Sequence, residues 1–189
     1  MELIQPNKKK SNYLDPFQAF SQRLDLMYKD MLYRQKFVKQ PNSVIYEDDA
    51  RQCATIEANS VDLVITSPPY VNNFDYADAT RLELMFWREV EGWGDLQSKI
   101  RKHLIRSCTQ HVSAERLELD ILLNNPNLSP VLGKLEEICN KLAAERMKHG
   151  GQKKYHLMVA AYFSDLAQVW QALRRVCRNG STICFVIGD

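Results

Sequence analysis

Residues 61–70 read VDLVITSPPY, an apolar run that ends at Ser67-Pro68-Pro69-Tyr70. Branched apolar residues favour a β-strand over Val61–Thr66. Proline lacks the N–H that a strand ladder needs, so the strand ends before Pro68. Two consecutive prolines fix φ near about −65° and bias the residue before each of them to extended backbone, which makes the loop rigid. In open α/β sheets, ligands bind at this carboxyl end of a strand.

The groups of this loop suit a planar ring that carries an amine. The Ser67 hydroxyl and the Pro68 carbonyl accept hydrogen bonds from an amino group, and Tyr70 offers a flat face for stacking. Base–aromatic stacking contributes about 1–3 kcal/mol, which offsets much of the cost of taking a base out of a duplex. The alternative is that Pro-Pro only ends a strand.

The Ser-Pro-Pro-Tyr sequence and its lead-in strand resemble the fourth motif of DNA amino-methyltransferases, Asp/Asn/Ser-Pro-Pro-Tyr/Phe/Trp. The resemblance implies direct methyl transfer from S-adenosylmethionine to an exocyclic base amine of DNA, with Ser67, Pro68, Pro69 and Tyr70 as the catalytic residues. A serine before Pro-Pro favours cytosine N4 over adenine N6. No cysteine follows a proline, so the Pro-Cys nucleophile of carbon-5 cytosine methylation is absent.

A second stretch resembles the same family. Residues 44–46 (VIY) and the acidic turn 47–50 (EDDA) are similar to the strand and turn that hold the adenine end of the cofactor. The resemblance implies that Asp49 and Thr66 bind S-adenosylmethionine. For Asp48 we favour a solvated acidic position. Residues 72–76 and 81–84 resemble the stretch after the motif in one bacterial and phage subgroup, without individual roles.

One part of the family pattern is missing. The cofactor loop, resembling Asp-Pro-Phe-x-Gly-x-Gly, has its nearest match at Asp15-Pro16-Phe17, where no glycine follows, and the first glycine of the chain is Gly92. Close backbone approach to the cofactor needs those glycines. We therefore expect Asp15 to cap a helix that begins at Pro16. The glycine loop is then expected either upstream or downstream in the same protein or in a second polypeptide.

The expected fold class is α/β, an incomplete Rossmann-like class I methyltransferase sheet with a helical insertion. Residues 1–40 are expected to form a disordered polar tail (1–12) and an amphipathic helix from Pro16 to about Lys39. Residues 41–189 are expected to form a partial catalytic domain, with residues 91–152 as a helical insertion for DNA recognition.

Within this catalytic part, the hydrophobic pattern predicts five successive segments. They are a strand at 44–47, a helical turn within 49–58, a strand at 61–66 parallel to the first, helices from 75 to 150 broken at Gly92-Trp93-Gly94, and a long helix at 155–177. Arg178-Asn179-Gly180 is expected to close that helix, with glycine as its C-terminal cap. A final strand is predicted at 181–187.

Composition excludes several classes. The chain has 189 residues, 45% hydrophobic and 25% charged, with a net charge of +2, and no apolar run approaches the ~20 residues of a membrane span. The polar N-terminus carries no secretory signal, so a cytoplasmic protein without membrane contact is expected. The five cysteines lack Cys-x-x-Cys spacing and the four histidines are scattered, so we predict no metal and place the histidines at the surface or at helix caps.

Basic residues gather in two segments, a pattern that DNA-contacting surfaces and ordinary solvated helix faces share. They are Lys99, Arg101, Lys102, His103 and Arg106 in the first, and Arg146, Lys148, Lys153 and Lys154 in the second. Two other classes of function stay open: an RNA or protein amide methyltransferase with a similar loop, and a catalytically inactive binding remnant.

Overall fold

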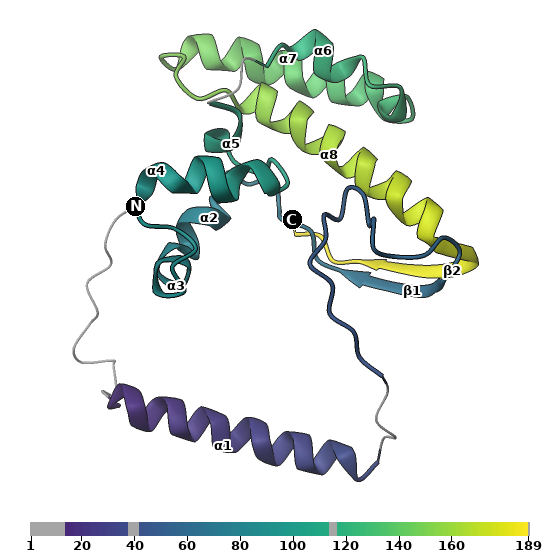
Figure 1. Ribbon diagram of the computed structural model, residues 1–189. Coiled ribbons are helices and arrows are strands. Elements are labelled where there is room, and N and C mark those ends of the chain that lie inside the picture. The colour runs from purple at the N-terminus through teal and green to yellow at the C-terminus, as the bar shows by residue number, and fades with distance from the viewer. Residues whose placement is uncertain (1–13, 38–41, 114–116, 189) are drawn as a thin grey trace. The chain divides into compact units, whose positions relative to one another are not determined.

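The computed structural model describes residues 14–37, 42–113 and 117–188. The chain divides into two compact units, Met1–Ile45 and Tyr46–Asp189, which are described separately (Figure 1). The predicted polar tail, residues 1–12, lies outside the described residues.

The first unit contains helix α1, Pro16–Gln35. Asp15 accepts hydrogen bonds from the backbone N–H groups of Phe17 and Gln18, and Pro16 occupies the first turn, so the predicted helix start is confirmed. The helix ends at Gln35, earlier than expected. Its apolar side chains are exposed, Phe17 by 84%, because no described residue of this unit covers them.

The second unit is built on a two-stranded parallel sheet, in which β1 (Val61–Thr66) pairs with β2 (Cys177–Phe185). The predicted strand 61–66 is confirmed. The predicted strand at 44–47 is wrong, and residues 49–58 form only turns. A short segment becomes a strand only where a neighbour satisfies its backbone, and Ile45 is 97% exposed. The parallel partner of β1 therefore comes from residues more than a hundred positions later.

The start of β2 also differs from the prediction. The preceding helix ends at Val176, and β2 begins at Cys177 rather than at Ser181. Register shifts between Val61↔Cys177 and Leu63↔Thr182, so residues 178–181 bulge out of the ladder. Gly180 adopts φ 87° in that bulge. Gly180 therefore belongs to an irregular part of the strand. It does not form the helix cap that was expected.

Short helical segments follow β1. They are α2 (Tyr76–Ala79), α3 (Arg81–Phe86), α4 (Trp93–Asp95), a π-helical turn η1 (Leu96–Ile100), a 3-10 turn η2 (Arg101–His103), α5 (Thr109–Ser113), α6 (Leu119–Leu123), a 3-10 turn η3 (Pro126–Leu128) and α7 (Leu132–Lys148). The predicted helices on both sides of Asn124-Asn125-Pro126 are confirmed. The predicted break near Gly92 is also present, since Gly92 precedes α4 as its N-cap.

Helix α8, Tyr155–Val176, is the longest element of the second unit, and its predicted range is confirmed within one residue. Its first half packs with α6 and α7 around Leu122, Leu135 and Ala161. Its second half packs on the sheet through Val169, Leu173 and Val176. Helix α8 therefore joins the helical layer to the strands, as Figure 1 shows.

The second unit is thus a mixed helix and strand structure with a small parallel sheet, compatible with an incomplete methyltransferase fold. The face of the sheet opposite α8 is uncovered by described residues, since Leu63 and Ile65 of β1 are exposed. Among the described residues, no helix is both long enough and apolar enough to cross a membrane.

Candidate active site

The Ser67–Tyr70 loop lines a pocket at the carboxyl end of β1. The backbone N–H of Val186 donates to the carbonyl oxygen of Thr66 at 2.9 Å, which extends the pairing of the strands to the edge of the loop. The pocket has a volume of about 380 Å³ and is lined by Ser67, Pro68, Pro69, Tyr70, Tyr76, Leu104 and Ile105. The four predicted catalytic residues therefore lie together, at the end of the strand where ligands bind in open sheets.

Helix α8 fixes the backbone of this loop. The hydroxyl of Tyr162 donates to the carbonyl oxygen of Pro69 at 2.8 Å. Tyr162 is buried, and burial raises the pKa of its hydroxyl, so the group stays a protonated donor at neutral pH. Proline has no backbone N–H, so the carbonyl is the hydrogen-bonding group of Pro69. Tyr162 of α8 donates to it.

The chain just after β2 limits where the Tyr70 ring lies. A Cβ atom built on Gly188 would come within 2.8 Å of Cε2 and 2.9 Å of Cδ2 of Tyr70. Any side chain at position 188 would displace the ring. Gly188 therefore lets the Tyr70 ring pack directly against backbone at the carboxyl end of the sheet.

Residues 72–75, which the sequence left without roles, connect the loop to the segment before α5. The Asn73 side-chain oxygen accepts from the N–H and the hydroxyl of Thr109, at 2.8 and 2.9 Å. The Asn73 N–H donates to the Ser107 carbonyl at 3.1 Å. Asp75 caps α2 and forms an ion pair of 2.6 Å with Arg101. These contacts hold Tyr76 at the pocket wall.

In the first basic segment, Arg101 and Arg106 form largely buried ion pairs, while Lys99, Lys102 and His103 are exposed. For these three exposed residues, a DNA-contacting surface and a solvated helix face both stay open. Arg101 pairs with Asp75, and Arg106 forms hydrogen bonds with Asp165 of α8, including one of 2.7 Å between Nη2 and Oδ1. Both arginine side chains are mostly buried. Arg106 also donates its backbone N–H to Asp165, so this residue organises the core and not a phosphate-binding face.

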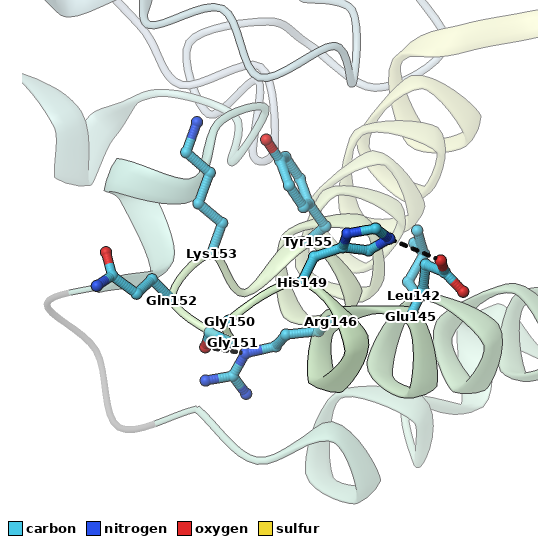
Figure 2. Close-up of a pocket in the computed structure, with 9 residues that line it drawn as sticks. All are labelled: Leu142, Glu145, Arg146, His149, Gly150, Gly151, Gln152, Lys153 and Tyr155. Carbon is cyan, nitrogen blue, oxygen red and sulfur yellow. Dashed lines mark hydrogen bonds and ion pairs between the residues drawn. The ribbon is translucent and has the colours of Figure 1, made fainter.

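The second basic segment surrounds a separate pocket at the end of α7, shown in Figure 2. Arg146, His149 and Lys153 line it, together with Gly150 and Gly151, and its volume is about 590 Å³. The Arg146 Nε group donates to the carbonyl oxygen of Gly151. Both glycines have positive φ, 77° and 73°, which allows the tight turn that brings Arg146 and Lys153 to one pocket.

The chain is similar in sequence to enzymes that are named for their reaction. It is 29% identical over 163 residues to the Type II methyltransferase M.BsoBI of Geobacillus stearothermophilus, covering 77% of this chain and 31% of that enzyme. It is 30% identical over 139 residues to the Type II methyltransferase M.AvaI of Nostoc sp. strain PCC 7120, covering 70% of this chain and 27% of the relative.

The resemblance to part of a DNA methyltransferase is confirmed. The chain spans less than a third of the length of these relatives. No family model matches the chain, and no solved structure matches it.

The two predicted cofactor residues come from different segments of the chain. Thr66 ends β1, directly before the loop. Asp49 pairs with Arg51, with 2.6 Å between Oδ2 and Nη2, and Arg51 also reaches the His103 carbonyl at 3.4 Å. Hydrogen bonds from Arg51 hold the pKa of the Asp49 carboxyl below its usual range. Asp49 is thus a charged acceptor that an arginine already engages.

The described residues do not fit a whole S-adenosylmethionine molecule. The sequence has no glycine before Gly92, so no glycine-rich turn precedes Asp49 to approach the methionine carboxylate. Asp49 offers one acceptor, and the Ser67–Tyr70 pocket of about 380 Å³ is walled by groups suited to a base.

Sequence reasoning missed several residues that shape the pocket at the end of β1. Tyr162, Gly188, Leu104 and Ile105 come from segments distant from the motif, and their proximity depends on the fold. Tyr162 carried a weak signal, because it is a polar-tipped residue on the apolar side of a predicted helix. The surface placement of the histidines was wrong for His111, which is 2% exposed.

Proposed function

We propose that this chain is the base-binding part of a DNA methyltransferase that acts on an exocyclic amine, with cytosine N4 favoured over adenine N6. The single observation that supports it best is the pocket at the end of β1, where Ser67, Pro68, Pro69 and Tyr70 share one wall. The names of the relatives support methyl transfer as the reaction class.

The proposed roles follow from the atoms of the pocket. The Ser67 hydroxyl and the Pro68 carbonyl accept hydrogen bonds from the N–H groups of the target amine. This arrangement favours a pyramidal nitrogen whose lone pair is free to react. Tyr70 stacks on the flipped base. Tyr162 holds the Pro69 carbonyl at 2.8 Å, so the acceptors are in place before the base arrives and little reorganisation is needed.

S-adenosylmethionine is the proposed methyl donor, and Asp49 and Thr66 are the residues of this chain that are proposed to bind it. We propose that the rest of the cofactor site lies in polypeptide beyond these 189 residues, either in the same protein or in a second chain that carries the glycine loop. With those parts added, the parallel pair β1–β2 would belong to a Rossmann-like sheet.

We further propose that the helical insertion, residues 91–152, contacts the DNA backbone through the pocket of Figure 2. The carboxyl end of a helix carries partial negative charge, yet the cations Arg146 and Lys153 outnumber the carboxylate Glu145 around this pocket. Each cation that neutralises a phosphate releases a counterion, so Lys153→Ala should lower the salt slope of DNA affinity by about one. Lys141→Ala is the matched control, because Lys141 pairs with Glu137 on exposed α7.

The proposal is tested by transfer of a labelled methyl group from S-adenosylmethionine to DNA, RNA and protein substrates. The chain is assayed alone and with a polypeptide that bears the glycine loop. Label in DNA, recovered as N4-methylcytosine after digestion to nucleosides, is the expected result. N6-methyladenine would overturn the base preference, and label only in RNA or in protein would identify a different methyltransferase class.

A further inference from the structure

Three metal-ligating side chains outside the base pocket meet in the interior. Asp75 comes from the start of α2, Cys108 directly precedes α5, and His111 lies within α5. One ligand atom from each of the three lies within 4.8 Å of the other two. Cys108 is fully buried, and His111 is 2% exposed.

His111 is the unusual member of this group. Within the part of the chain that the structure describes, neither ring nitrogen has a hydrogen-bond partner of good geometry. Its Nε2 atom lies 4.0 Å from Oδ1 of Asp75. Leaving a buried polar group without a partner is destabilising. A metal ion at this position would give a ring nitrogen of His111 the partner that it lacks.

Asp75 has one oxygen engaged and one directed to the cluster. Its Oδ2 atom accepts from Arg101 at 2.6 and 3.1 Å. Its Oδ1 atom makes only longer contacts, 3.3 Å to the Asp78 N–H and 3.4 Å to Arg101 Nε. A metal-bound carboxylate is commonly held by a partner on its other oxygen, which orients it. Arg101 is placed to do this for Asp75.

Cys108 and His111 have a local spacing that the sequence-based expectation overlooked. They read Cys108-Thr109-Gln110-His111, and residues three apart at the start of a helix face the same side. A search for paired cysteines misses a cysteine and a histidine at this interval. The acidic third ligand, Asp75, comes from 33 positions earlier and is visible only in the fold.

We propose that Asp75, Cys108 and His111 bind a divalent zinc-like ion, contrary to the absence of metal expected from sequence. One sulfur, one nitrogen and one oxygen donor suit zinc. In a tetrahedral site with bonds of about 2.0–2.3 Å, donor atoms lie about 3.5 Å apart, so the three side chains would draw together by about 1 Å. On binding, the Cys108 thiol releases its proton to solvent, and the three donors replace water ligands of the ion. A remaining water fills the fourth position.

The position of this site gives it a structural role. Asn73 already ties the stretch after the Ser67–Tyr70 loop to Thr109 and Ser107, and the ion would add a bridge from Asp75 to the same segment. Tyr76, the next residue, lines the base pocket. The ion would brace the pocket wall without touching the substrate, and its presence does not depend on which base is methylated.

Metal binding is tested on the 189-residue chain by titrating the metal-free protein with Co²⁺ and then with Zn²⁺. The expected result is one Co²⁺ per chain with a thiolate-to-cobalt charge-transfer absorption, which Zn²⁺ abolishes by displacement. A folded wild-type chain that shows no such absorption would overturn the site, whatever the variants do.

Two variants and a matched control assign the ligands. Cys108→Ser should abolish the charge-transfer absorption, and His111→Gln should weaken Co²⁺ binding at least about tenfold. Cys139→Ser should leave both unchanged, because Cys139 is equally buried but lies in α7, where its thiol contacts the His156 carbonyl. Retention of the absorption in Cys108→Ser, or its loss in Cys139→Ser, would contradict the assignment.

Discussion

Tyr162 donates its hydroxyl hydrogen to the carbonyl oxygen of Pro69 at 2.8 Å, although the two residues are 93 positions apart. This bond joins the longest helix of the unit to the middle of the Ser-Pro-Pro-Tyr loop. The prolines restrict the loop from within, and Tyr162 restricts it from outside.

Tyr162→Phe should therefore loosen the loop while keeping the buried ring in place. Loss of one buried hydrogen bond should reduce the free energy of unfolding by about 1 kcal/mol, measured by urea denaturation. Methyl transfer by the complete enzyme should fall more than this loss of stability explains at a temperature where both proteins are folded. Tyr28→Phe, on the exposed helix α1, serves as the control and should change neither quantity.

Gly188→Ala tests the packing of Tyr70. The new methyl group would lie 2.8 Å from the ring, so the ring must shift, and a misplaced stacking group is expected to cost about tenfold or more in turnover. Gly133→Ala is the matched control, because nothing lies within 4 Å of a Cβ atom there and alanine favours a helix by up to about 1 kcal/mol. Similar turnover for the two variants would contradict the assigned contact.

Asp165 carries the main buried charge interaction. It is 1% exposed and pairs with Arg106 at 2.7 Å. The Nη1 atom of Arg51 lies 3.9 Å from Oδ1 of the same carboxylate. Asp165→Asn should lower the free energy of unfolding by about 3 kcal/mol, since it leaves buried cationic groups without a carboxylate. Asp62→Asn removes an exposed pair with Arg178 and should cost less than about 1 kcal/mol. Equal losses of the free energy of unfolding in the two variants, measured by urea denaturation, would show that the buried pair stabilises the fold no more than the exposed pair.

His156 should make the chain less stable in mild acid. Burial, and then the charges of Arg146 and Lys154, lower the pKa of His156 below its ordinary value. Its contribution to stability is thus complete above the unfolded pKa of about 6.5 and is lost as pH falls through the lower folded pKa. His156→Gln should flatten the decline of the melting temperature between about pH 7 and 5. The exposed His103→Gln should retain the decline, and a decline unchanged in His156→Gln would contradict the assignment.

Local patterns predicted the elements that the chain encodes locally. Asp15-Pro16 begins α1, the run 61–66 is a strand, and the apolar stripe 155–176 is a helix. Failures came where a distant partner decides the outcome. Residues 44–47 have strand-forming side chains but no neighbouring strand, and Gly180 lies in a bulge instead of capping a helix.

In the candidate site, too, local features were predicted and contacts between distant residues were missed. The loop residues Ser67–Tyr70 are adjacent in sequence, so the motif placed them together. Arg106 pairs with Asp165, which lies 59 positions later in the sequence. Counting charges along the chain could not predict this pair. Burial of His111 beside Asp75 likewise depends on packing between α2 and α5.

The most direct test of the account compares Ser67→Ala with Ser98→Ala in the complete enzyme, measuring methyl transfer to DNA and DNA affinity in parallel. Ser98 is exposed and lies outside the pocket. Because the Ser67 hydroxyl is proposed to hold the reacting amine, Ser67→Ala should lower turnover about a hundredfold with DNA affinity changed by less than about twofold, while Ser98→Ala behaves as the wild type. Equal turnover in the two variants would contradict the role of the Ser-Pro-Pro-Tyr loop in catalysis.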